Sequence, residues 1–141
     1  MEYKKFGNTY IVRLDVGDEI MESLKKFVTD EKIKLAQING LGGASDFIIG
    51  VRNPITKQYD PIEYSGRYEI ANIHGNVTLL EGEPYLHIHF GCGNEKGEYH
   101  GGHLIKCVIG ATAEIFVTTY DGVINRQLDP KTELEVFGFG G

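Results

Sequence analysis

The histidines are the residues of this sequence whose type and spacing could do chemistry. The chain has five, and His87 and His89 stand two positions apart in the apolar run from Tyr85 to Phe90. In a strand, residues two apart point to the same face. Two imidazole nitrogens on one rigid face can hold a cation at about 2.0–2.1 Å. If the segment that begins at His103 pairs with this strand as a hairpin, His103 completes a set of three nitrogen ligands for a divalent metal.

The identity of such a metal follows from its ligands. Three neutral imidazoles suit zinc, nickel, copper or iron better than magnesium or calcium, and zinc is the metal we expect. The alternative is a pair of histidines that are merely exposed or hydrogen-bonded, because HxH is a weak signal by itself. We expect His100 to be exposed or to support a ligand from outside the coordination shell, and His74 to end a strand.

Catalysis is conceivable at such a site, because three protein ligands leave a position for water or a carboxylate. The metal could lower the pKa of that water to about 7, and Glu69 or Glu114 could act as a general base. The reaction would be hydrolysis or hydration of a small substrate. Nucleophilic catalysis has little support: no serine lies in a GxSxG-like setting, and Cys92 and Cys107 form no CxxC motif.

The elements that position the histidines are expected to be mostly strands, separated by glycine-containing turns. The strand-like segments are residues 9–14, 34–38, 47–51, 68–73, 77–80, 85–90, 104–108 and 113–119. Asn39–Gly43 is expected to be a turn with unusual dihedrals or a close backbone approach, and Gly93–Gly102 a long polar loop.

One helix is expected after Gly17, with Asp18 as its cap. Its apolar stripe, at positions i, i+4, i+7 and i+8, consists of Ile20, Leu24, Phe27 and Val28. The predicted fold class is therefore α+β, a predominantly antiparallel sheet packed on one main helix.

Length, composition and charge narrow the class of protein. The 141 residues, 41% of them hydrophobic and 24% charged, are typical of one globular domain. No apolar run approaches the ~20 residues that cross a bilayer, and no signal-like core is present, so we expect a cytoplasmic protein with no membrane partner. The formal net charge of −6 and the dispersed basic residues argue against tight autonomous DNA binding.

Four short stretches follow one another in the order seen in a known family. They are Gly66–Ile70 (GRYEI), Ile73–Val77 (IHGNV), Leu86–His89 (LHIH) and Gly101–Leu104 (GGHL). Together with the expected helix, the Asn39–Gly42 segment and Glu114, they make the chain from about Tyr10 to Phe137 resemble the PPC domain, the plants-and-prokaryotes conserved domain. The resemblance is to the stand-alone prokaryotic type.

The resemblance implies an antiparallel sheet of about seven strands with a helix packed on it, assembled as a homotrimer. It implies that His87, His89 and His103 are the metal ligands, as in stand-alone prokaryotic members. It also implies that the interaction stretch of plant members corresponds to Gly66, Arg67, Tyr68, Glu69 and Ile70. The polar face of an ordinary strand would explain Arg67 and Glu69 equally well.

The sequence also departs from that family. The Arg-Gly-Arg-Pro element (AT-hook), which enters the DNA minor groove in plant members, is absent from these residues. Ala71 and His74 differ from the residues common at those positions, which weakens the transfer of a particular partner.

We therefore expect residues 1–141 to form a single PPC-like domain that acts as a homotrimeric, metal-binding module. Its role would be binding or regulation, with a protein or a small molecule as partner and DNA or transcription as a further context. The alternative is a zinc-type metalloenzyme that hydrolyses or hydrates a small substrate, with catalytic residues unassigned beyond the candidates Glu69 and Glu114.

Overall fold

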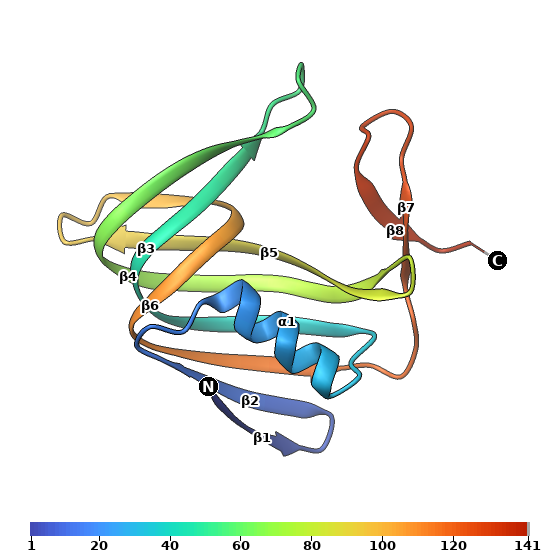
Figure 1. Cartoon of the computed structure of the whole chain (residues 1–141), viewed down its shortest axis with the longest axis horizontal. Coiled ribbons are helices and arrows are strands. Elements are labelled where there is room, and N and C mark those ends of the chain that lie inside the picture. Colours follow the sequence, from blue (N-terminus) through green and yellow to red (C-terminus); the bar gives the residue numbers. More distant parts are fainter. Residues whose placement is uncertain (141) are drawn as a thin grey trace.

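The computed structural model describes residues 1–140 of the chain. Its elements, drawn in Figure 1, are β1 (Glu2–Phe6), β2 (Thr9–Asp15), α1 (Ile20–Asp30), β3 (Ala36–Arg52), β4 (Tyr59–Leu80), β5 (Glu83–Asn94), β6 (Tyr99–Thr119), β7 (Asn125–Leu128) and β8 (Glu135–Gly138). The α+β prediction is confirmed, but the described residues form eight strands, not about seven. None of the helices in residues 1–140 is long and apolar enough to span a membrane.

All eight strands belong to one sheet, in the order β1-β2-β6-β3-β4-β7-β8, with β5 bound to both β4 and β6. Since β3 also pairs with both β4 and β6, strands β3, β4, β5 and β6 close a ring. The three long strands β3, β4 and β6 bend to do so, as Figure 1 shows. Register shifts in their pairing, at which a strand bends most readily, interrupt β3 on both of its sides.

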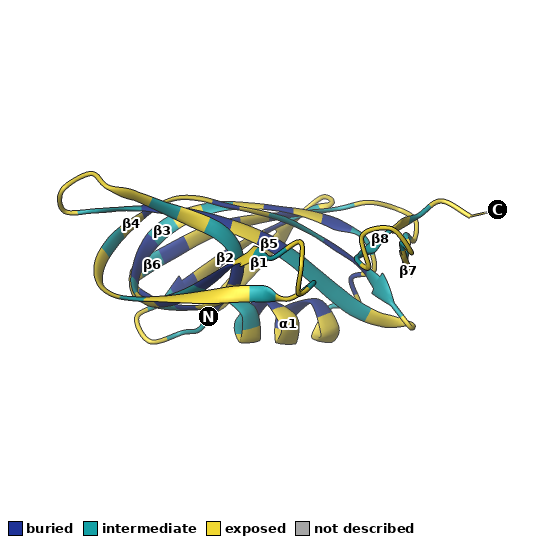
Figure 2. Cartoon of the chain, turned by 90° about the horizontal axis from the view of Figure 1, so that it is seen from above, coloured by how far each residue is buried: buried dark blue, intermediate teal, exposed yellow. Residues whose placement is uncertain are grey.

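The helix α1 covers one face of the sheet (Figure 2). Its predicted apolar stripe is confirmed, because Ile20, Leu24, Phe27 and Val28 are all fully buried. The predicted cap was wrong: the cap is Glu19, whose side chain accepts a hydrogen bond from the backbone N–H of Glu22. The Asp18 carboxylate instead accepts from the N–H of Asp15 and pairs with the N-terminal ammonium group.

The glycine-rich Asn39–Gly43 segment lies inside β3, so the expected turn there was wrong. The close backbone approach that we expected is present. A Cβ atom on Gly42 would lie 2.3 Å from the carbonyl oxygen of Thr112 in β6. Glycine therefore lets β3 pass close to β6 where both strands bend.

The expected long loop at Gly93–Gly102 was also wrong, since β5 and β6 form an antiparallel hairpin with only residues 95–98 between them. Asn94 holds this turn: its side-chain oxygen accepts from the N–H groups of Lys96 and Glu98. The polar, glycine-bordered sequence suggested a loop. Its two ends instead pair as strands, because local hydrogen bonds to the Asn94 side chain hold a tight turn between them.

The β7–β8 hairpin stands apart from the ring, beside the turn between β4 and β5 (Figure 1). Among the described residues, β4 and β7 pair only at Leu79 and Asn125, in parallel. The attachment of the β7–β8 hairpin to the sheet therefore depends largely on side chains, and these side chains matter for the cavity described below.

Candidate metal centre

The β5–β6 hairpin brings His87, His89 and His103 together. Along β5 the core side is taken by buried Ile88 and Phe90, so that His87 and His89 project from the opposite side. Their Nε2 atoms are 3.2 Å apart. His103 on β6 is the register partner of His89. The predicted hairpin geometry is therefore present.

The three imidazoles form a compact group of nitrogen atoms. One ligand nitrogen from each residue lies within 4.8 Å of the other two. The Nδ1 atom of His103 is buried and has no hydrogen-bond partner. A buried polar atom usually finds a partner, so this nitrogen is suited to an additional ligand such as a metal ion.

The spacing fits metal coordination. Two nitrogens bound to one ion at about 2.05 Å with a tetrahedral angle lie about 3.3 Å apart, and the Nε2 atoms of His87 and His89 are 3.2 Å apart. Three imidazoles and one free position form the donor set of many catalytic zinc sites. The residues present therefore fit a divalent transition metal.

The surroundings of His87 and His103 favour their neutral forms, which metal ligation requires. Burial, assisted by the nearby His103 and His89, lowers the pKa of His87 from 6.5 to about 4. Burial and the neighbouring His89 also lower the pKa of His103. The lowered pKa values of His87 and His103 therefore favour neutral side chains at these two positions at physiological pH.

Tyr59 is a neighbour of this centre that the sequence did not reveal. Its ring stacks on His103, with the centroids 4.2 Å apart and an interplanar angle of 23°. Gly50 makes room for it, because a Cβ atom on Gly50 would lie 3.0 Å from the Cβ of Tyr59. Tyr59 thereby restricts the orientation of His103. Because Tyr59 is far from His103 in the sequence, the spacing of residues gave no indication of this contact.

The other two histidines lie outside the group. His74 on β4 is the exposed register partner of His89, but its nitrogens are not part of the three-residue cluster. His100 packs against the ring of Tyr64, with the centroids 4.4 Å apart. His100 thus belongs to an aromatic cluster on another part of the β5–β6 hairpin.

Neither candidate general base joins the histidines. Glu69 pairs with Gly93, four positions along β5 from His89 and roughly 13 Å away at the usual rise per residue. Glu114 is separated from His89 by three strand spacings, roughly 14 Å along the sheet. The histidine cluster contains no Asp or Glu among the described residues.

The two cysteines are free and buried. Burial raises the pKa of Cys92 to about 11 and that of Cys107 to about 12. Both thiols therefore stay protonated and act as small apolar core residues.

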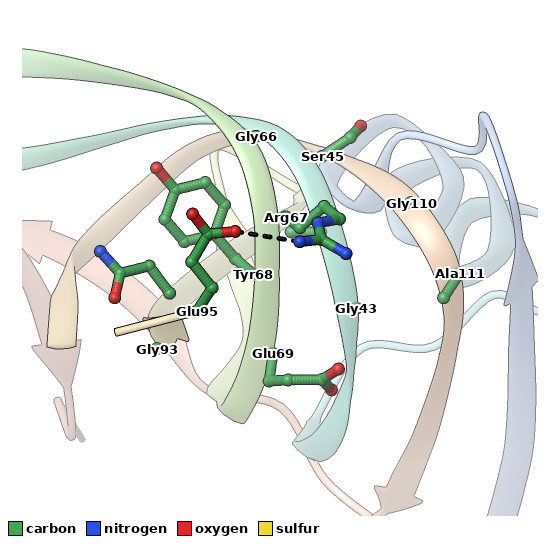
Figure 3. A pocket seen from close by; sticks show the side chains of 12 residues that line it. Gly43, Ser45, Gly66, Arg67, Tyr68, Glu69, Gly93, Glu95, Gly110 and Ala111 are labelled. Atoms are coloured by element: carbon green, nitrogen blue, oxygen red, sulfur yellow. Dashed lines mark hydrogen bonds and ion pairs between the residues drawn. The ribbon is translucent and has the colours of Figure 1, made fainter. Parts of the chain in front are cut away.

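The first four residues of the Gly66–Ile70 stretch, Gly66 to Glu69, line a separate cavity of about 370 Å³ (Figure 3). Arg67 forms an exposed ion pair with Glu95 at 3.0 Å, while the Glu69 side chain extends elsewhere along the cavity. Ile70 is buried and Tyr68 packs edge-on against Phe47. The stretch thus alternates between core and surface, as a strand does, and its outer residues are accessible to a partner.

Comparison with known proteins gives a consistent family assignment. Residues 1–121 match the family model of the Plants and Prokaryotes Conserved (PCC) domain. The search of curated proteins gave no match.

Three solved structures are similar over nearly their whole length. A protein from Bacteroides thetaiotaomicron, described as a putative DNA-binding protein, superposes with a TM-score of 0.94 at 32% identity and covers 98% of this chain and 96% of its own. A plant- and prokaryote-conserved (PPC) protein from Pyrococcus horikoshii has a TM-score of 0.86 at 34% identity, with 99% and 96% covered. A metal-containing protein from Archaeoglobus fulgidus has a TM-score of 0.86 at 28% identity, with 97% and 98% covered.

Proposed function

We propose that this chain, which belongs to the Plants and Prokaryotes Conserved domain family, is a metal-binding module that holds one divalent transition metal on His87, His89 and His103. The observation that carries the proposal is the cluster of three imidazoles, with two Nε2 atoms 3.2 Å apart. The metal content of the similar Archaeoglobus fulgidus protein supports it. The all-nitrogen donor set favours zinc among the available metals.

We further propose that residues 1–141 act as a single cytoplasmic domain that assembles as a homotrimer. The sheet face opposite α1 supports self-association, because it carries three large apolar side chains on adjacent strands. Ile11, Leu41 and Phe116 are 39%, 53% and 49% exposed. An exposed apolar patch of this kind is typical of an interaction surface.

The proposed role is binding or regulation, with the accessible Gly66–Ile70 surface as the contact region for a protein partner. A DNA-associated role is supported by the description of the Bacteroides thetaiotaomicron protein. The net charge of −6 favours an indirect role in such a complex over strong phosphate contacts by this chain.

The metalloenzyme alternative has weaker support. A hydrolytic centre of this kind needs a carboxylate within reach of a metal-bound water, and Glu69 and Glu114 lie elsewhere. The three-histidine cluster is therefore better suited, on its own residues, to binding than to proton transfer.

Metal content per chain, measured by elemental analysis on tag-free protein, tests the proposal. We expect close to one zinc per chain after reconstitution, and a loss of that metal in His87→Ala/His89→Ala. His74→Ala is the matched control, since His74 lies on the neighbouring strand outside the cluster, and it should retain the metal. Wild type that takes up no zinc would overturn the proposal.

A further inference from the structure

A second cavity lies beside the histidines, between the sheet and the β7–β8 hairpin. It has a volume of about 280 Å³. His87 and Tyr85 of β5 line one side, and Leu134, Val136 and Phe137 of the hairpin region line the other. At about 30 Å³ per water molecule, the space holds a small organic molecule. His87 is thus shared between the metal centre and this cavity.

Arg126 of β7 is the polar group that organises the cavity. Its Nε donates to the hydroxyl of Thr78 at 2.9 Å, and one Nη donates to the side-chain oxygen of Asn76 at 2.9 Å. The other Nη donates to the backbone carbonyl of Glu135 at 2.6 Å. The contacts with Thr78 and Asn76 attach the hairpin to β4, the contact with Glu135 joins β7 to β8, and all three together fix the guanidinium in one orientation.

The faces of the guanidinium are also fixed. The rings of Tyr85 and Phe137 lie 4.6 and 5.0 Å from its carbon atom. All three of its hydrogen-bond acceptors are neutral, and within residues 1–140 it makes no ion pair. An arginine has five N–H groups, so donors remain for a ligand.

One acidic residue moderates this positive charge. Burial lowers the pKa of Arg126, and Tyr85 and the carboxylate of Glu135, which lines the same cavity, partly oppose that lowering. The Glu135 carboxylate does not come within ion-pair distance of the guanidinium. The Arg126 guanidinium is therefore held in a fixed orientation, and its positive charge is only partly neutralised. Beside the apolar wall of the cavity, such a cation is suited to binding the carboxylate group of a ligand.

We propose that this cavity binds a small organic carboxylate with an apolar or aromatic body, and that Arg126 is the partner of the carboxylate group. The apolar body would lie against Leu134, Val136 and Phe137. The proposal extends the proposed metal-binding function, since the ligand would lie next to His87, but Arg126 alone supplies the charge recognition.

The histidines lie within residues 1–121, which match the family model, whereas Arg126 and the apolar wall follow them in residues 125–138.

Calorimetric titration with benzoate and with neutral benzyl alcohol tests the proposal, on zinc-reconstituted and on chelator-treated protein. Benzoate should bind at least about tenfold more tightly than benzyl alcohol, because only benzoate can form an ion pair with the guanidinium. Arg126→Gln should abolish this preference. Glu135→Gln should strengthen benzoate binding, a gain that misfolding cannot mimic, and Val136→Phe should weaken the binding of both compounds by filling the cavity.

Equal binding of benzoate and benzyl alcohol, or benzoate binding that Arg126→Gln leaves unchanged, would overturn the proposal. Binding of benzoate that requires zinc but not Arg126 would assign the anion to the metal and overturn it too. Arg126-dependent binding in protein that takes up no zinc would support the cavity while the metal centre fails. Metal content measured on each variant separates the two results.

Discussion

Gly75 lies on β4, the hydrogen-bonded neighbour of the strand that carries His87 and His89. It pairs with Ile88, and a Cβ atom built on it would lie 2.2 Å from the backbone carbonyl oxygen of His87. Ordinary contact begins at 3.4 Å, so Gly75→Ala must move the main chain of β5 by about 1.2 Å (3.4 minus 2.2). Backbone cannot rotate away as a flexible side chain can, so the pairing of β4 with β5 has to distort around this position.

We expect Gly75→Ala to lower the free energy of unfolding by about 3 kcal/mol, near the upper end of the usual cost of overpacking. The displaced strand would carry His87 and His89 away from their present relation to His103. Misplaced ligands should weaken zinc binding by about 10- to 100-fold, the range seen when support of a metal ligand is lost. Urea unfolding of zinc-free protein measures the first effect, and zinc titration against a competing chelator measures the second.

Gly93→Ala is the matched control, on β5, the strand that carries His87 and His89. A Cβ atom on Gly93 would meet no heavy atom within 4 Å, and its backbone is not left-handed. The change should leave zinc binding intact and alter the free energy of unfolding by less than about 1 kcal/mol, with stabilisation favoured. If Gly75→Ala matched Gly93→Ala in both measurements, the close approach of β4 and β5 would not constrain the site as argued.

Three further predictions concern stability and assembly. Glu81 and Gly82 form a two-residue hairpin loop with φ of 52° and 85°. Glu81→Asn should raise the free energy of unfolding measured in urea by about 1 kcal/mol, because asparagine tolerates this left-handed backbone better than glutamate. An unchanged unfolding midpoint would contradict this prediction. The folded pKa of His87 is lowered to about 4, so the unfolded chain takes up a proton at this residue at higher pH than the folded protein does. The free energy of unfolding of the zinc-free protein should therefore fall by about 1–2 kcal/mol, after allowance for solvent screening, as pH falls from about 6.5 to 4. This fall should be smaller in His87→Gln, and an equal pH dependence of stability in both proteins would refute the assignment. Phe116→Glu should reduce the mass measured by light scattering from trimer toward monomer, whereas Ile55→Glu, a change at an 88% exposed position, should not; equal masses would exclude this face as the interface.

The sequence predicted the helix and the histidine cluster because both depend on local spacing. The stripe from Ile20 to Val28 repeats with the helical period, and His87 and His89 follow the two-residue period of a strand. His103 was included as the third candidate ligand because it begins the next apolar segment, although the connection before it was expected to be a long loop. Local periodicity was therefore enough to predict the secondary structure and the facing of these residues without any long-range contact.

The remaining features depend on contacts between distant segments. Glycines at positions 40 and 42 read as a turn, although they serve the close approach of β3 to β6. Tyr59 and Arg126 reach the neighbourhood of His87 only through the closed ring and the attached hairpin. Neither residue type is unusual in its own segment, so no pattern of spacing could have selected it.

The placement of all three candidate ligands on one hairpin makes a bound metal a removable cross-link. His89 and His103 are fourteen positions apart (103 minus 89), and joining the ends of a loop of about 15 residues is worth about 3 kcal/mol in the chain-entropy treatment of disulfides. His87 and His89, however, stay close together in the unfolded chain and can retain some metal there, which subtracts from the stabilisation. If the proposed metal binds, the HxH pair would govern its capture, and His103 would govern whether the captured metal cross-links the folded hairpin.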